Sequence, residues 1–207
     1  MKKMMKGSIF LMVAVMILLA NCNRGKSVES WPLVTDAGVF TVYPYSDRDN
    51  NMKGSSMIRM KEKDNSGAAT TEKYLYVKGR VTTQYPYGYA GIAIKPDAKA
   101  LEALRSNIAG IKMRISGDGK QYRFSLDTSN VTDGNTFGKI FNAPKNPDDI
   151  EFKFSDLTQE PWGNIQSFEQ ILIQNLKIQT VGQPISAFNF SIFNIEIIYK
   201  DETKDDK

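Results

Sequence analysis

The sequence contains no histidine and one cysteine, and these two shortages exclude several kinds of site. Among its 207 residues there are 0 His, and the single cysteine is Cys22. Without histidine the chain builds no Ser-His-Asp triad, no Cys-His dyad and no His-ligated zinc site. One thiol makes neither an internal disulfide nor a multi-cysteine metal site, so the position of Cys22 must explain its presence.

An excess of charge of one sign is also missing from the part of the chain expected to fold. The whole sequence has 27 Lys and Arg against 23 Asp and Glu, but Lys2, Lys3 and Lys6 lie in a segment with the features of a removable leader. Without those three lysines the count is 24 against 23, a net charge of +1. The basis for a nucleic acid or an anionic membrane surface as partner then disappears, and we expect a neutral or mixed partner.

The N-terminal segment is typical of a bacterial secretory signal. Residues 1–8 carry three lysines, and residues 9–20 form an unbroken apolar run of 12 residues. This run has the length of a signal-peptide core and falls short of the ~20 residues that span a bilayer.

The end of this segment, Leu19-Ala20-Asn21-Cys22, resembles the bacterial lipobox, in which a signal peptidase cuts before a cysteine that is then acylated. Asn21 departs from the usual Gly, Ala or Ser. The alternative is an ordinary signal peptide with an incidental cysteine. We expect a lipoprotein signal peptide over residues 1–21 and a polar tether over residues 22–30, with Cys22 lipidated. Several acyl chains anchor a protein durably, which predicts a membrane-anchored lipoprotein of the bacterial cell envelope, on its periplasmic face or at the cell surface.

The rest of the chain shows the alternation of apolar and polar residues that indicates short strands, with one helix. Asp97 can cap that helix, which we expect within residues 96–108, and Gly110 can end it. In the last strand the apolar positions change parity between Ile192 and Phe193, which predicts a β-bulge. About ten strands and one helix predict an all-β fold, a two-sheet antiparallel β-sandwich over residues 31–200, followed by a charged, disordered tail at 201–207. The expected strands of the chain after the first loop are 57–61, 74–83, 111–116, 121–126, 136–142, 150–154, 168–180 and 188–199.

Residues 111–126 are expected to form a β-hairpin at the centre of the sandwich. A two-residue turn at Asp118-Gly119 would place Ile115 opposite Tyr122 and Arg114 opposite Arg123. All apolar residues of the hairpin would then share one face. The two arginines would lie side by side on the other.

Aromatic and cationic residues provide the candidate binding site. Tyr85, Tyr87 and Tyr89 occupy every second position, so extended backbone aims the three rings to one side, where they either plug an end of the sandwich or form a ligand platform. Together with Arg114 and Arg123 they are candidates for a ligand-binding cleft; otherwise both arginines simply solvate an outer sheet. Trp162 is assigned to packing. No pair of carboxylates has a spacing that indicates glycoside hydrolysis.

A polar loop at residues 47–56 is the candidate metal site. Asp47, Asp49 and Asn51 have the alternate oxygen spacing of a calcium loop, but Met52 and Ile58 stand where an EF-hand needs Gly and Glu. A solvated loop is the favoured interpretation, with a different type of calcium site as the alternative.

Several short motifs occur in an order that resembles a known family. They are Lys53-Gly54-Ser55-Ser56, Gly117-Asp118-Gly119-Lys120-Gln121-Tyr122, the run from Asp149 to Leu157, the run from Gln159 to Gly163, and Phe193-Asn194-Ile195. Together they resemble the galactose-binding-like jelly rolls grouped around the complex I intermediate-associated protein 30 (CIA30) domain and family 11 carbohydrate-binding modules. The resemblance covers residues 31–199. Lys53 stands where the family commonly has glycine.

The resemblance implies a jelly roll without catalytic residues, whose concave face or loop end binds glycans or proteins. It also implies a structural calcium as an option, for which Asp47 and Asp49 are the candidate ligands. The hypothesis is therefore a lipid-anchored, non-catalytic, carbohydrate-binding module of the envelope. The alternative is a protein-binding or assembly module that uses the same face, since a fold does not determine a function.

Overall fold

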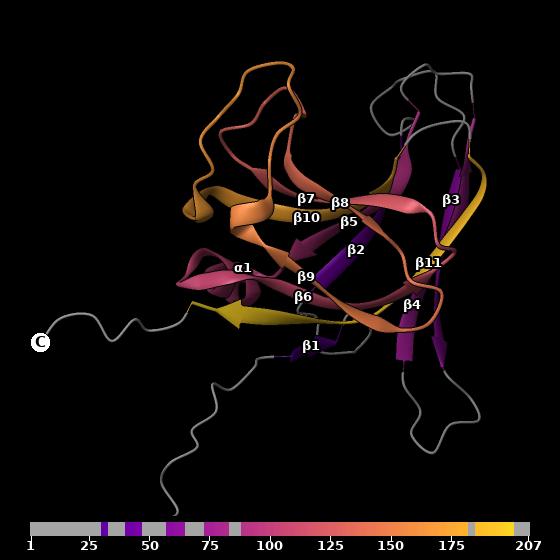
Figure 1. The fold of residues 1–207 in the computed structure, drawn as a ribbon. Coiled ribbons are helices and arrows are strands. Elements are labelled where there is room, and N and C mark those ends of the chain that lie inside the picture. The colour runs from indigo at the N-terminus through magenta and orange to yellow at the C-terminus, as the bar shows by residue number, and fades with distance from the viewer. Residues whose placement is uncertain are drawn as a thin grey trace, which may run out of the picture.

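The computed structural model describes residues 30–32, 40–46, 57–64, 73–82, 88–181 and 185–200, and within these ranges the chain forms two stacked antiparallel sheets (Figure 1). Sheet A has the order β3-β4-β11-β6-β9, and β1 pairs with β11 beside this path. Sheet B has the order β2-β5-β10-β7-β8. The predicted β-sandwich with one short helix is confirmed.

The strands of the two sheets alternate along the sequence. Sheet A contains β1 (Ser30–Pro32), β3 (Met57–Asp64), β4 (Lys73–Val81), β6 (Ile108–Gly117), β9 (Asp148–Lys153) and β11 (Ile185–Tyr199). Sheet B contains β2 (Phe40–Ser46), β5 (Ala90–Pro96), β7 (Gln121–Thr128), β8 (Phe137–Asn142) and β10 (Ile173–Thr180). Because most consecutive strands lie in different sheets, the chain repeatedly passes from one sheet to the other.

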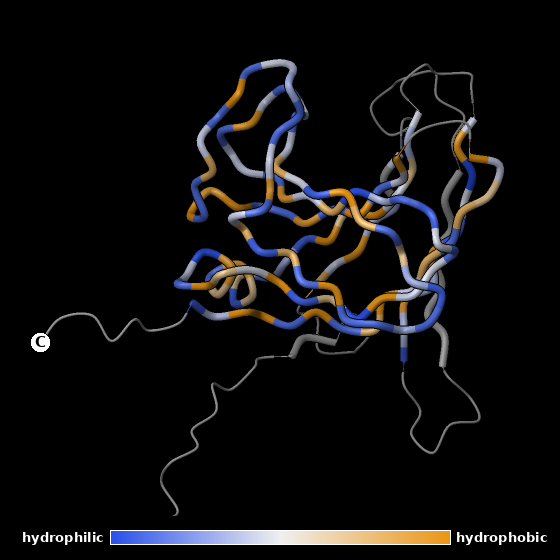
Figure 2. The backbone as a smooth tube through the Cα atoms, viewed as in Figure 1, coloured by the Kyte–Doolittle hydropathy of each residue, from blue (hydrophilic) through white to orange (hydrophobic). Residues whose placement is uncertain are grey.

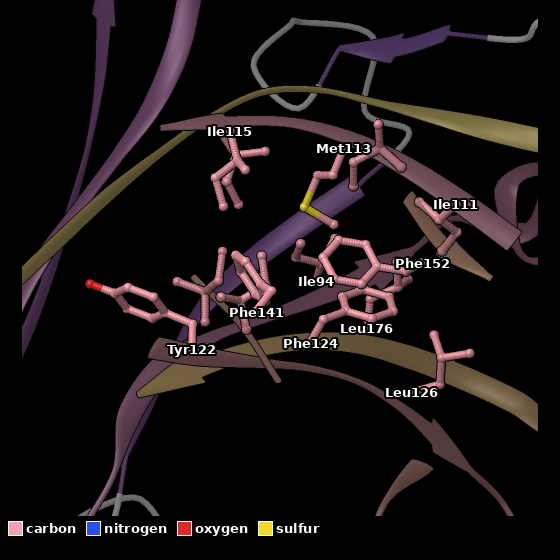
Figure 3. Close-up of a cluster of buried hydrophobic side chains, with 14 of the residues drawn as sticks. Ile94, Ile111, Met113, Ile115, Tyr122, Phe124, Leu126, Phe141, Phe152 and Leu176 are labelled. Atoms are coloured by element: carbon pink, nitrogen blue, oxygen red, sulfur yellow. The ribbon is translucent and has the colours of Figure 1, made fainter. Parts of the chain in front are cut away.

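The core lies between the sheets and follows from the two-residue period of the strands. Apolar residues of β6 point inward from sheet A, and those of β7 point inward from sheet B (Figure 3). Ile115 and Phe124 are fully buried, and Phe124 stacks on Phe152 with ring centroids 4.2 Å apart. Hydrophobic positions alternate with polar ones along these strands in Figure 2.

The predicted hairpin at residues 111–126 is wrong, although its apolar residues are core. β6 pairs with β11 and β9, whereas β7 pairs with β10 and β8. The turn between β6 and β7 carries the chain from one sheet to the other, and it bonds to the β8–β9 connection: Gly119 N donates to Ala143 O at 3.0 Å, and Ala143 N donates to Lys120 O at 3.0 Å. Apolar alternation is the same in a hairpin and in such an arch, because in both the apolar residues face one core.

The helix α1 (Ala98–Arg105) covers one end of the sandwich. As predicted, Asp97 caps it, accepting a 2.7 Å hydrogen bond from Ala100 N. It ends at Arg105, with Ser106 as its C-cap, and does not reach Gly110. Gly110 belongs to β6 and lies so close to β9 that a Cβ there would meet Phe152 O at 2.4 Å. Two short 3₁₀ turns, η1 (Phe154–Asp156) and η2 (Gln170–Leu172), precede β10. Within the described ranges, no helix has the length and apolar character needed to cross a membrane.

The predicted β-bulge in β11 is confirmed, since the register with β6 shifts between Ile192 and Asn194. Ile192 packs in the core, while Phe193 lies outside the core cluster and is buried by its neighbours on sheet A. The Phe193 ring centroid lies 5.1 Å from that of Tyr74 and 5.9 Å from the Arg114 guanidinium carbon. Arg114 therefore packs on an aromatic ring of sheet A.

Candidate functional site

The outer face of sheet B, called here the sheet B face, carries side chains in register across five strands. Its central row consists of Tyr43, Ala93, Lys177, Ser125 and Gly138. In the neighbouring row, Gln179 lies opposite Arg123. The alternate residues of the same strands fill the core, so the outward rows are set by the same two-residue pattern that forms the sandwich.

An exposed aromatic ring stands at one end of this row. The Tyr43 side chain is 46% exposed, and its cross-strand neighbour Ala93 is too small to cover it. A tyrosine ring left open on a flat sheet presents an apolar face with a polar tip.

On the far side of Ala93 from Tyr43, the middle of the face is a polar network. Lys177 Nζ lies 2.8 Å from Asp127 Oδ1, and both side chains are mostly shielded, at 15% and 18% exposure. Asn175 lies directly opposite Asp127 and donates to its other oxygen at 3.5 Å. With Gln179 in the next row, the face offers a cation, a carboxylate and two amides within a few strand positions, which supplies both donors and acceptors.

Arg123 fixes the far end of the face to a loop. Its guanidinium group forms an ion pair with Glu160 and donates to Thr136 O at 3.1 Å and Thr158 O at 3.0 Å. The lack of a side chain at Gly138 leaves room for the Arg123 side chain, because a Cβ at that position would meet Arg123 Nε at 2.6 Å. Arg123 is therefore engaged in holding the loop, so it acts on the face as a positioning residue.

The loop held by Arg123, residues 158–167 and called here the Trp162 loop, rises at one end of sheet B (orange in Figure 1). Asn135, which is 1% exposed, donates to Glu160 O and Trp162 O and accepts from Glu160 N. Asp133 accepts from Asn164 N at 2.8 Å and from Asn135 N at 3.0 Å, and these backbone bonds hold the pKa of its carboxyl below its usual range. Side-chain bonds to backbone thus give an irregular loop a defined shape.

The braced loop leaves large apolar side chains in solvent. Trp162 is 52% exposed and Ile165 is 62% exposed, so the assignment of Trp162 to packing is wrong. The polar residues around Trp162 bond to the backbone of the loop, but the indole ring itself is not packed among them. The Trp162 indole is thus presented to solvent on a backbone that side-chain hydrogen bonds hold in place.

The structure separates the two arginines of the expected cleft. Arg114 lies opposite Asn194 and Asp149 on the outer face of sheet A, and Arg123 lies on the sheet B face. The two outer faces of a sandwich point in opposite directions, so the prediction that both arginines line one cleft is wrong.

The other candidate residues have different outcomes. Tyr89 directly precedes β5 at the end of sheet B and is half-buried, with contacts of its own. Tyr85 and Tyr87, the proposed calcium ligands Asp47 and Asp49, and Cys22 lie outside the described residues. Among the residues that the structure describes, no three His, Cys, Asp or Glu gather to hold a metal ion.

Sequence reasoning missed Tyr43, Asp127, Lys177 and Gln179 as members of one face. Their alternation with core residues marks them as outward-pointing, but it does not show which strands are neighbours. Only the order β2-β5-β10-β7 brings residues 43 and 177 onto the same surface.

The two-sheet sandwich with one short helix is a fold like that of carbohydrate-binding modules. The family model of complex I intermediate-associated protein 30 (CIA30) matches residues 44–197, and the chain belongs to this family. No curated protein sequence matches the chain.

Solved structures of family 11 carbohydrate-binding modules from Clostridium thermocellum share the fold. One, in complex with a β-1,3-1,4-mixed-linked tetrasaccharide, has a TM-score of 0.56 and 16% identity and covers 84% of this chain and 97% of its own. Another, from the cellulosomal cellulase Lic26A-Cel5E, has a TM-score of 0.57 and 18% identity and covers 86% of this chain and 99% of its own. At this level of identity the similarity concerns the fold.

Proposed function

We propose that the protein is a non-catalytic module that binds a carbohydrate on the sheet B face. The observation that carries the proposal is the cross-strand register that puts exposed Tyr43 in the same row as Lys177, two strands away across Ala93, on the face that also holds Asp127 and Asn175. Sugars have apolar faces that pack on aromatic rings and hydroxyl pairs that need donors and acceptors at fixed positions. A rigid sheet supplies both without an ordering cost on binding.

The similar fold of the family 11 modules supports this choice of ligand, since one of them holds a tetrasaccharide. The near-neutral folded region also favours a neutral glycan over a highly charged polymer on this face. We place the site on sheet B alone, with the Trp162 loop as its wall and Arg123 as the residue that fixes the wall.

A glycan array followed by calorimetry on the purified protein tests the proposal. Tyr43→Ala and Gln179→Ala are each expected to weaken binding about tenfold, the effect of losing one stacked ring or one pair of hydrogen bonds. Lys153→Ala, at an exposed position on β9 of the other sheet, is the matched control and is expected to bind normally. Absence of glycan binding in both the presence and the absence of calcium would refute the proposal. Comparison of the two conditions also tests whether calcium, for which Asp47 and Asp49 are the candidate ligands, contributes to binding.

A second candidate function is protein binding at the envelope, and the exposed Trp162 and Ile165 favour it. Tryptophan is enriched among residues that dominate protein interfaces. Stable co-purification of an envelope protein that is lost in Trp162→Ala, together with an inactive glycan array, would select this function.

The anchor at Cys22 is part of the proposal and has its own test. We expect a radioactive or clickable fatty acid to label the wild-type protein in bacteria and to leave Cys22→Ser unlabelled. Equal labelling of both proteins would contradict the anchor without affecting the binding site.

A further inference from the structure

A groove lies on the outer face of sheet A, along the paired strands β4 and β11. Figure 1 shows these two strands. The groove has a volume of about 510 Å³, and the polar side chains that line it are Tyr76, Lys78, Arg80, Ser186 and Asn189. A second β-bulge forms it: Val81 pairs with Ile185 and Gly79 with Phe188, so residues 186 and 187 both face Arg80. Such a bulge bends the strand and redirects its side chains, and bulges are common beside binding sites.

The groove is basic. Lys78 and Arg80 are exposed, and neither forms an ion pair with a described residue. The adjacent strand β3 places Arg59 and Lys61 at the backbone positions opposite Lys78 and Tyr76. No carboxylate is among the residues that line the groove, so Lys78 and Arg80 give it a positive charge.

Two carboxylates of sheet A, those of Glu196 and Asp149, pair with a lysine outside the groove. Lys112 Nζ lies 2.6 Å from Glu196 Oε2 and 3.7 Å from Asp149 Oδ2, near the opposite end of β11. The hydrogen bond that Lys112 donates to Glu196, with the charges of Glu196 and Asp149, outweighs the cost of burial and raises the pKa of Lys112 above its usual range. Lys112 is therefore neutralised by carboxylates of its own sheet, whereas Lys78 and Arg80 form no ion pair with a described residue.

We propose that this groove binds an acidic polysaccharide, one that carries carboxylate or sulfate groups. The planar guanidinium of Arg80 suits the two oxygens of such a group, and Lys78 adds a second charge two residues away on the same strand. Tyr76, Ser186 and Asn189 supply the ring, hydroxyl and amide that a sugar needs beside its acidic group. A flat anionic membrane does not need a concave site lined by hydroxyl and amide groups.

This site is separate from the carbohydrate site proposed for the sheet B face, because it lies on the other outer surface. The two proposals can therefore be refuted independently, because variants of Lys78 and Arg80 change only the groove on sheet A and leave Tyr43 and Gln179 on sheet B unchanged.

Affinity electrophoresis of the purified full chain in gels containing polygalacturonate, dextran sulfate or neutral dextran tests the site. The wild type is expected to be retarded by at least one acidic polymer and by neutral dextran not at all. Lys78→Gln/Arg80→Gln is expected to bind at least tenfold more weakly, since each lost charge-assisted hydrogen bond accounts for about a factor of ten. Lys145→Gln/Lys153→Gln removes the same charge from exposed positions outside the groove and is expected to be retarded like the wild type.

A variant that fills the groove without changing its charge distinguishes binding within the groove from attraction of the polymer by surface charge alone. Ser186→Trp is expected to abolish retardation although all the cations remain, and Ala187→Trp is the second choice if the first unfolds on thermal denaturation. Retardation that survives the filled groove, or falls equally in both charge variants, would overturn the proposal. So would binding to vesicles of anionic phospholipid, lost in Lys78→Gln/Arg80→Gln, with no binding to either acidic polysaccharide.

Discussion

At the scale of single residues, Asp118 joins the two sheets at the point where the chain crosses between them. Its carboxylate accepts from the Tyr122 hydroxyl at 3.0 Å, from Lys120 N at 3.1 Å, and from Asn189 N at 3.2 Å. Tyr122 belongs to sheet B and Asn189 to sheet A. Burial alone raises the pKa of Asp118, but the ion pair with Lys120 Nζ at 2.7 Å, together with these hydrogen bonds, outweighs it and holds the pKa below its usual range.

Asp118→Asn is expected to destabilise the protein by about 1–3 kcal/mol at neutral pH, because an amide nitrogen replaces an acceptor facing buried donors. The folded-state pKa is lowered, so the carboxylate stabilises the fold at pH values above the ordinary aspartate pKa of about 4, and this contribution is lost as the pH falls through the folded-state value. Urea denaturation of wild type and variant at several pH values should show the difference shrinking only below about pH 4. Glu151→Gln, at an exposed position, is the control; a difference that does not change with pH would contradict this role for the charge.

Asn135 acts at the same scale on the Trp162 loop. Asn135→Ala removes the bonds to Glu160 and Trp162 and leaves their backbone groups without these partners. We expect a loss of about 1–3 kcal/mol and a loop that moves more freely. In a Trp31→Phe background, lower fluorescence anisotropy of Trp162 should report the motion, whereas Asn142→Ala, exposed on β8, should leave the anisotropy unchanged. Equal anisotropy in the Asn135 variant would show that the loop is fixed by other contacts.

At the scale of elements, the crossing between β6 and β7 determines which surfaces exist. If these strands formed a hairpin, their polar residues would share one face; because they lie in separate sheets, Arg114 and Arg123 are on opposite sides of the molecule.

Engineered disulfides can distinguish the two topologies. In a Cys22→Ser background, Ser116→Cys with Ser191→Cys joins positions that pair directly between β6 and β11, where Cα atoms of opposed residues are about 4.5–5.5 Å apart. We expect this pair to oxidise readily, as measured by a mobility shift on non-reducing gels. Ser116→Cys with Gln121→Cys, opposite each other in the hairpin predicted from sequence, is expected to stay reduced. If the second pair oxidised and the first stayed reduced, the hairpin predicted from sequence would be correct and the pairing of β6 with β11 would be wrong.

Local features were predictable because they depend on residues near each other in sequence. The Asp97 cap requires only the following turn, and the bulge at Ile192 and Phe193 is visible as a change of parity within one strand. The neighbours of a strand are set by contacts across the whole chain. Tyr43 and Lys177 share a row because β5 lies between β2 and β10, and no pattern within either segment contains that information.

At the scale of the whole molecule, the net charge is near neutral, but the two outer faces differ in how their charges are distributed. The sheet B face combines an exposed tyrosine with a paired cation and anion, whereas the groove on sheet A gathers cations without carboxylates. The sum over residues removed the basis for a nucleic acid or an anionic membrane surface as partner. The distribution over the two sheets favours a neutral glycan on one side and an acidic polysaccharide on the other, an arrangement in which one module joins two polymers.

This arrangement predicts that the two ligands bind without competition. Mutations at sites that share no contacts have additive effects, and ligands on opposite outer faces should likewise leave each other's affinity unchanged. Calorimetric titration of the neutral glycan is expected to give the same dissociation constant in the absence of polygalacturonate and at saturation with it. Tyr43→Ala should weaken only the first ligand, and Lys78→Gln/Arg80→Gln only the second. Competition between the ligands, or one variant weakening both, would show that they share a single surface and would contradict the assignment of one site to each sheet.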